Sequence, residues 1–275
     1  MALPLGRAKP DALFLRIASA AVLAPVALYA AWQGPPVLSV LSVLAAAVMG
    51  WEWGRLCGGG RFGAVGQLTV ASEFLGVGAA AAGWFLSGLT ALAVGAIAVS
   101  LVTFGQKKAA PWGALGVLWI GIPAIALIWL RLGNETGRAT VLWIFALVWA
   151  TDSAAYAVGR AIGGPRLMPR WSPKKTWSGL LGGVAAAGLV GIGAAYLTGA
   201  RLIVPVLAVS LCLGAIEQLG DLMESMAKRH FGVKDTSGLI PGHGGLLDRL
   251  DGMLVVVFAA AAITLLSGYN VIAWQ

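Results

Sequence analysis

The sequence predicts an all-α polytopic membrane protein with about nine transmembrane helices. Of its 275 residues, 59% are hydrophobic and 11% are charged, and the mean hydropathy is +0.86. Soluble domains contain about 25% charged and 45–50% apolar residues, so an ordinary soluble fold is excluded. The two cysteines, Cys57 and Cys212, lie in apolar stretches without a CxxC pattern, which excludes a disulfide scaffold and a zinc ribbon.

Nine apolar stretches have the length of about 20 residues that a helix needs to cross a bilayer. They are too long for the tilted strands of a membrane β-barrel. Only Ser87-Gly88 separates the third from the fourth. Arg7 and Lys9 precede the first, as in a signal peptide, but Arg16 interrupts it and more spans follow, so a retained helix is favoured. The expected spans are 13–33, 36–56, 65–86, 89–106, 112–131, 139–159, 179–198, 202–222 and 253–272.

The basic residues predict the orientation of these spans. If the N-terminus is cytoplasmic, sixteen of the 19 basic residues face the cytoplasm, as the positive-inside rule requires. The C-terminus then lies on the opposite side, and the polar connections 160–178 and 223–252 are cytoplasmic. Topology thus accounts for the net charge of +8, with anionic lipid headgroups as natural contacts. No stripe of basic and aromatic residues indicates a nucleic-acid partner.

The carboxylates are concentrated near the C-terminus. Six of the eleven lie within one stretch, at Glu217, Asp221, Glu224, Asp235, Asp248 and Asp251. Charged side chains at bilayer depth are costly and usually face a cavity or a partner. The spacing of Glu217, Asp221, Glu224 and Lys228 puts all four on one helical face. Bound Mg²⁺ would relieve the repulsion between these acids, whereas pairing of Glu224 with Lys228 is the simpler interpretation.

Two segments have the character of phosphate-binding loops. After the acidic face comes a loop with glycines at 238, 242, 244 and 245, where the backbone can approach a ligand closely and offer N–H groups to an anion. The segment 172–179 combines adjacent lysines with hydroxyls before a helix N-terminus, although a cap in an ordinary basic loop would look the same. No Walker A pattern occurs. Asp152 and Tyr156 lie one turn apart in an apolar span, and we assign Glu52 and Glu73 no function beyond interhelical contacts.

The stretch from Ser225 to Asp251 resembles the signature of the phosphatidate cytidylyltransferase family, also called CDP-diacylglycerol synthase. Segments around Asp221, Ser172–Trp177 and Asp152–Arg160 also look like this family, so the resemblance covers about 150–252. Ser178 stands where an acidic residue is common in the family, and we assign it no role. The matching signature positions are Ser225, Lys228, Arg229, Lys234, Asp235, Ser237, Pro241, His243, Gly244, Gly245, Asp248, Arg249 and Asp251.

The resemblance implies Mg²⁺-dependent transfer of a cytidylyl group from CTP to phosphatidate, giving CDP-diacylglycerol and pyrophosphate. We expect Asp221 and Asp235 to hold Mg²⁺, with room for a second divalent or a monovalent cation. The expected catalytic residues are Asp221, Asp235, Lys228, Arg229, Lys234, His243, Asp248, Arg249 and Asp251. The expected substrate-binding residues are Ser172, Lys174, Lys175, Thr176, Ser225, Gly244, Gly245, Asp152 and Tyr156.

We further expect residues 1–136 to form accessory or oligomerising helices and 137–275 to form the catalytic region. Helix faces rich in glycine and alanine would support a homodimer. The location implied is the cell (inner) membrane, with the active site facing the cytoplasm. Two other functions stay open. A CTP-dependent polyprenol kinase would release CDP instead of pyrophosphate, and a secondary transporter or lipid flippase would show internal repeats, which this sequence lacks.

Overall fold

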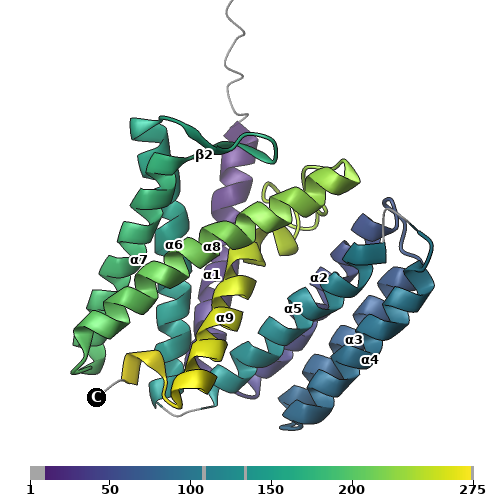
Figure 1. Ribbon diagram of the computed structural model, residues 1–275, viewed down its shortest axis with the longest axis horizontal. Helices are drawn as coiled ribbons and strands as arrows, with labels where there is room; N and C mark the ends of the chain where they lie inside the picture. The colour runs from purple at the N-terminus through teal and green to yellow at the C-terminus, as the bar shows by residue number, and fades with distance from the viewer. Residues whose placement is uncertain (1–9, 107–109, 133–134, 274–275) are drawn as a thin grey trace, which may run out of the picture.

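The computed structural model describes residues 10–106, 110–132 and 135–273, which form nine long helices and one small hairpin (Figure 1). The helices of the first half are α1 (Pro10–Gln33), α2 (Val37–Cys57), α3 (Ala64–Ala81), α4 (Phe85–Thr103) and α5 (Ala110–Arg131). Those of the second half are α6 (Glu135–Ile162), α7 (Trp177–Thr198), α8 (Ile203–Phe231) and α9 (Leu247–Ser267). The short 3-10 helix η1 (Val271–Ala273) follows them.

Eight of these helices, α2 to α9, are long and apolar enough to cross a membrane, and α1 adds a shorter apolar stretch, Ile17–Gln33. The predicted all-α polytopic architecture is therefore confirmed. Its orientation stays a prediction, because no membrane accompanies the chain. Four of the basic residues that indicate it, Arg7, Lys9, Lys107 and Lys108, lie outside the described residues.

Three local features differ from the prediction. The third and fourth spans are separated at 82–84 instead of Ser87-Gly88, because Gly83 adopts a φ of +90° that ends the helical path after α3. Helix α8 continues to Phe231 and α9 already begins at Leu247, so helix replaces much of the expected polar connection 223–252 and leaves the loop 232–246. The other connection contains an unexpected antiparallel hairpin, β1 (Arg166–Met168) and β2 (Ser172–Thr176).

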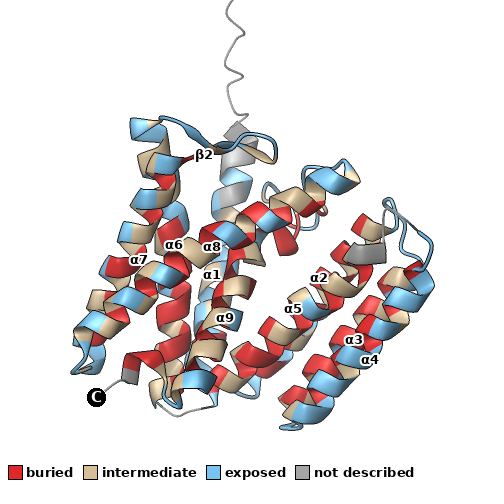
Figure 2. Ribbon diagram, in the orientation of Figure 1, coloured by how far each residue is buried: buried red, intermediate tan, exposed pale blue. Residues whose placement is uncertain are grey.

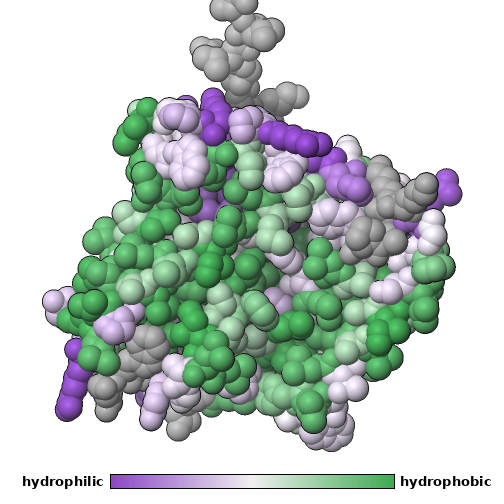
Figure 3. Space-filling model, in the orientation of Figure 1, coloured by the Kyte–Doolittle hydropathy of each residue, from purple (hydrophilic) through white to green (hydrophobic). Residues whose placement is uncertain are grey.

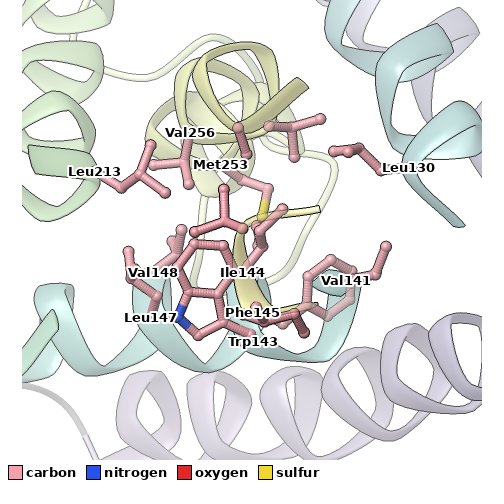
Figure 4. Close-up of a cluster of buried hydrophobic side chains, with 14 of the residues drawn as sticks. Leu130, Val141, Trp143, Ile144, Phe145, Leu147, Val148, Leu213, Met253 and Val256 are labelled. Carbon is pink, nitrogen blue, oxygen red and sulfur yellow. The ribbon is translucent and has the colours of Figure 1, made fainter. Parts of the chain in front are cut away.

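The helices form two packed groups. Helices α2 to α5 share one hydrophobic core with Ala227 of α8 and Leu247 and Leu254 of α9. Helices α6 to α9 share another, which α1 and the end of α5 complete. Figure 4 shows part of the second core, where Trp143 and Ile144 of α6 face the helices that carry Leu213 and Met253. In Figure 1, α8 runs obliquely across the front of its group toward the α2–α5 group.

Polar segments gather at one end of the molecule. The hairpin, the C-terminal end of α8 and the start of α9 all lie at the upper end in Figure 1. Figure 2 shows mostly exposed residues in the hairpin, and Figure 3 shows hydrophilic atoms along this upper edge above a broad hydrophobic surface. This distribution places the two polar connections together at one boundary of the apolar region.

A close glycine contact between α2 and α3 provides a test of this packing. A Cβ at Gly54 would lie 2.2 Å from the Cα of Gly66, whereas a Cβ at Gly78 would meet nothing within 4 Å. We expect Gly54→Ala to lower the free energy of unfolding by about 1–3 kcal/mol through overpacking. Gly78→Ala, the matched control on α3, should leave stability unchanged or raise it by up to about 1 kcal/mol. Equal thermal unfolding midpoints of the two variants in detergent would contradict the packing.

Candidate functional site

The acidic face of α8 is the centre of the site. The helix runs without a break through Glu217, Asp221, Glu224 and Lys228, so their spacing places them along one side. Glu217 and Glu224 are buried, with 1% and 2% of their surface exposed. Buried charges of this kind need partners, and other segments supply them.

Three carboxylates converge between α8 and α9. Oxygens of Asp221, Glu224 and Asp251 all lie within 4.8 Å of one another. Hard cations such as Mg²⁺ take carboxylate oxygens as ligands, so this cluster fits a divalent cation. Asp235, which the sequence analysis pairs with Asp221, is not in this cluster within the described part of the chain. It lies exposed in the loop after α8, near Gly244.

The β hairpin brings a lysine to the cluster. The Lys175 Nζ of β2 lies 2.7 Å from an Asp221 carboxylate oxygen. Ser225, one turn along α8, donates a hydrogen bond of 3.3 Å to the other oxygen of Asp221. Asp221 has no basic residue within a turn of its own helix, so its cation comes from a segment more than forty residues earlier in the chain. Three residues expected in the site, Asp221, Lys175 and Ser225, are thereby brought together.

Lys228 links the two helices that carry the acids. Its ammonium group forms an ion pair with Glu224 on α8, as the simpler interpretation of their spacing predicts, and a second pair of 2.8 Å with Asp248 on α9. The same ammonium group thus bridges carboxylates of α8 and α9.

Asp248 also organises the glycine-rich loop. Its second oxygen accepts hydrogen bonds from the Thr236 backbone N–H at 2.9 Å, the Thr236 hydroxyl at 3.0 Å and the Gly245 N–H at 2.8 Å. Next to it, Gly244 has a φ of +89°, a conformation that glycine adopts without strain. A Cβ at Gly245 would lie only 2.1 Å from the Thr236 hydroxyl. Gly244 and Gly245 therefore shape this loop through backbone geometry and close packing.

The polar network continues deeper along α8. Asp152 on α6 interacts electrostatically with Glu217, and Gln218 donates a hydrogen bond of 2.7 Å to the same glutamate. Asp152 therefore reaches the acidic face, as expected. Tyr156, one turn further on α6, is exposed and accepts a hydrogen bond of 3.1 Å from Arg160.

Several other expected residues have local roles or lie at the rim. Thr176 caps the N-terminus of α7 by accepting a hydrogen bond of 3.1 Å from the Gly179 N–H. His243 contacts the α1 residue Ser19, with 2.6 Å between Nδ1 and the hydroxyl oxygen. Arg229 donates to the Val233 carbonyl at 2.8 Å. The site's exposed rim contains Lys174, Arg229, Lys234, Asp235 and Arg249, and Ser172 is half-buried on β2.

The catalytic, substrate-binding and metal residues expected from the sequence leave out two residues that the structure places here. Glu224 belongs to the acidic cluster. Glu52 of α2 contacts the loop through Ser237 and the backbone of Leu246 and Leu247. The only available signal for Glu52 was a carboxylate within an apolar span, and that signal does not indicate a partner.

An apolar cavity lies between the helices of the two groups. It has a volume of about 140 Å³ and lies between α1, α2, α5, α6 and α9. Leu250 of α9 is part of its wall, so the helix that contributes Asp251 to the acidic cluster also lines the cavity. The wall also contains Ala45, Met49, Phe145, Trp149 and Met253. This arrangement combines a charged region with an apolar space, which suits a ligand that has a polar head and an apolar tail.

Comparisons with known proteins agree with this chemistry. The model of the cytidylyltransferase family matches residues 14–267. A phosphatidate cytidylyltransferase of Brucella suis is 41% identical over 266 residues, which cover 92% of each chain. Proteins of the same name from Haemophilus influenzae and Bacillus subtilis are 44% and 39% identical, over 50% and 52% of this chain and 51% and 54% of their own lengths. The chain therefore belongs to the cytidylyltransferase family.

Proposed function

We propose that this protein is a phosphatidate cytidylyltransferase that converts CTP and phosphatidate into CDP-diacylglycerol and pyrophosphate. The observation that carries the proposal is the cluster of Asp221, Glu224 and Asp251 with its two lysines, formed in part by α9, which also lines an apolar cavity. Family membership and the names of the relatives support the same reaction. The positive-inside pattern supports a site that faces the cytoplasm across the inner membrane.

The reaction needs charge compensation more than a protein nucleophile. A phosphate oxygen of phosphatidate forms a bond to the α-phosphorus of CTP, and the bond from that phosphorus to the bridging oxygen breaks, releasing pyrophosphate. A phosphate monoester has its second pKa near 6 and is largely dianionic at neutral pH, so it needs no general base. The difficulty is to bring two polyanions together, and fixed cationic groups lower that barrier.

We propose that the acidic cluster holds Mg²⁺ through Asp221, Glu224 and Asp251. The convergence of their oxygens supports this set better than the pair of Asp221 and Asp235 that the sequence suggests. A bound divalent cation would neutralise charge on the phosphates of CTP. Lys175 pairs with Asp221 and Lys228 pairs with Glu224, so two of the three carboxylates are held by lysines.

The phosphates themselves are assigned to the exposed rim. Lys174, Lys234 and Arg249 are solvent-exposed, so their cationic groups are available to an incoming polyanion. Arginine binds phosphate through two parallel hydrogen bonds, and lysine acts as a compact charge. The acyl region of phosphatidate would enter the cavity that Leu250 lines, and its phosphate would then reach the cluster along α9, which contributes to both.

Product analysis of the purified protein tests the reaction. With CTP, phosphatidate and Mg²⁺ in detergent, we expect pyrophosphate and CDP-diacylglycerol in equal amounts, and no turnover after chelation of Mg²⁺. Asp221→Asn should lose at least about tenfold in turnover, equivalent to about 1.4 kcal/mol, while Glu135→Gln, an exposed change on α6, should not. Release of CDP would indicate a lipid kinase and contradict the proposal.

A cavity-filling variant tests the acyl site. Ala45→Leu should raise the KM for long-chain phosphatidate about fourfold or more, since losing the burial of one methylene costs about 0.8 kcal/mol. The KM for CTP should be unchanged, and a short-chain phosphatidate should be affected less. Ala93→Leu adds the same volume at an exposed position on α4 and serves as the control. An equal rise in KM for CTP and both lipids would refute the acyl assignment.

A further inference from the structure

Glu52 joins the N-terminal helices to the signature loop. It lies on α2 with no exposed surface. One carboxylate oxygen accepts hydrogen bonds from the Ser237 hydroxyl at 2.5 Å and the Leu246 N–H at 2.9 Å, and the other accepts one from the Leu247 N–H at 2.7 Å. These partners follow it by 185 to 195 residues. Both ends of the segment 237–247 are therefore attached to a single side chain.

Two of these bonds cap α9. The first N–H groups of a helix have no partner within it, and helix starts favour a nearby negative charge. Leu246 occupies the N-cap position and has no side-chain oxygen to fill that role. Glu52 supplies the missing acceptor from another helix, and charge-assisted hydrogen bonds of this kind are the strong ones.

The loop is shaped to admit this carboxylate. A Cβ at Gly245 would lie 2.5 Å from a Glu52 oxygen and 2.1 Å from the Thr236 hydroxyl. Any side chain at Gly245 would therefore displace Glu52 or Thr236. Gly245 also donates its N–H to Asp248. The carboxylates of Glu52 and Asp248 therefore accept hydrogen bonds from adjacent backbone groups of the same turn.

The position of α9 decides where the acids of the site lie. Asp248 pairs with Lys228 from the first turn of α9, and Asp251 joins the acidic cluster from the next. A shift or rotation of this helix start would move both carboxylates relative to α8. Reacting groups must be held accurately, since a misplacement of 1 Å can cost about a hundredfold in rate.

We propose that Glu52 is a positioning residue for cytidylyl transfer, which fixes the loop 237–247 and the start of α9 so that Asp248 and Asp251 face α8. It acts through the loop and touches neither substrate. The N-terminal helices then form part of the catalytic unit. The expected effect on the rate of cytidylyl transfer rests on the proposed function, whereas the expected effect on the position of the loop does not.

Kinetics and hydrogen exchange of matched variants test it. Glu52→Gln keeps the shape of the side chain but replaces one acceptor oxygen by an amide NH₂ group, which cannot accept hydrogen bonds from backbone N–H groups. We expect its kcat to fall about tenfold or more with a KM for CTP close to wild type, and amide exchange of peptides covering 237–250 to accelerate. Ser237→Ala, which removes one of the three bonds, should give a smaller change in the same two readouts. Glu73→Gln neutralises the other fully buried glutamate of the N-terminal half and should leave both readouts within about twofold of wild type.

Two results would overturn the inference. One is a folded Glu52→Gln protein with kcat within twofold of wild type and unchanged exchange in 237–250. The other is a loss in Glu73→Gln equal to that in Glu52→Gln, which would indicate a general cost of removing a buried carboxylate. If wild type itself shows no cytidylyl transfer, the proposed function fails, and loop exchange still decides whether Glu52 fixes the loop.

Discussion

Carboxylates buried near the boundary of an apolar region must be matched by cations or donors, and this constraint determines how the site is assembled. An ionised group in such surroundings costs several kcal/mol unless it is paired and hydrogen-bonded. Lys175 from the hairpin and Lys228 from α8 meet acids on α8 and α9. These ion pairs thus hold the hairpin and both helices in one relative arrangement. The same charged groups belong to the proposed active site.

Each helix group has its own hydrophobic core, but residues of α8 and α9 also pack into the core of α2 to α5, and the two groups meet again at the polar end. Glu52 of α2 binds the loop before α9. The apolar cavity likewise has walls from both groups. A division into accessory and catalytic helices at residue 136 stays a prediction, and these contacts favour a site to which both groups contribute.

Hydropathy was enough to predict nine helices, because a helix that crosses a bilayer needs a continuous apolar stretch of about 20 residues. Periodicity also indicated the acidic face of α8. The pairing of Lys175 with Asp221 and the role of Glu52 could not be predicted, since both depend on contacts between segments distant in the chain. Asp235 was assigned as a metal ligand because of its position in the motif. Which acids join Asp221 in the cluster depends instead on which turn of α9 faces α8.

Direct measurement of cation binding tests the central claim that α8 and α9 together form the cation site. Mn²⁺, which takes similar oxygen ligands and is detected by EPR, can be titrated into the purified protein without substrates. We expect a site that weakens at least about tenfold, or about 1.4 kcal/mol, in both Asp221→Asn and Asp251→Asn, and that persists in Asp235→Asn. Unchanged Mn²⁺ affinity in the first two variants, or loss of binding in Asp235→Asn alone, would contradict the claim.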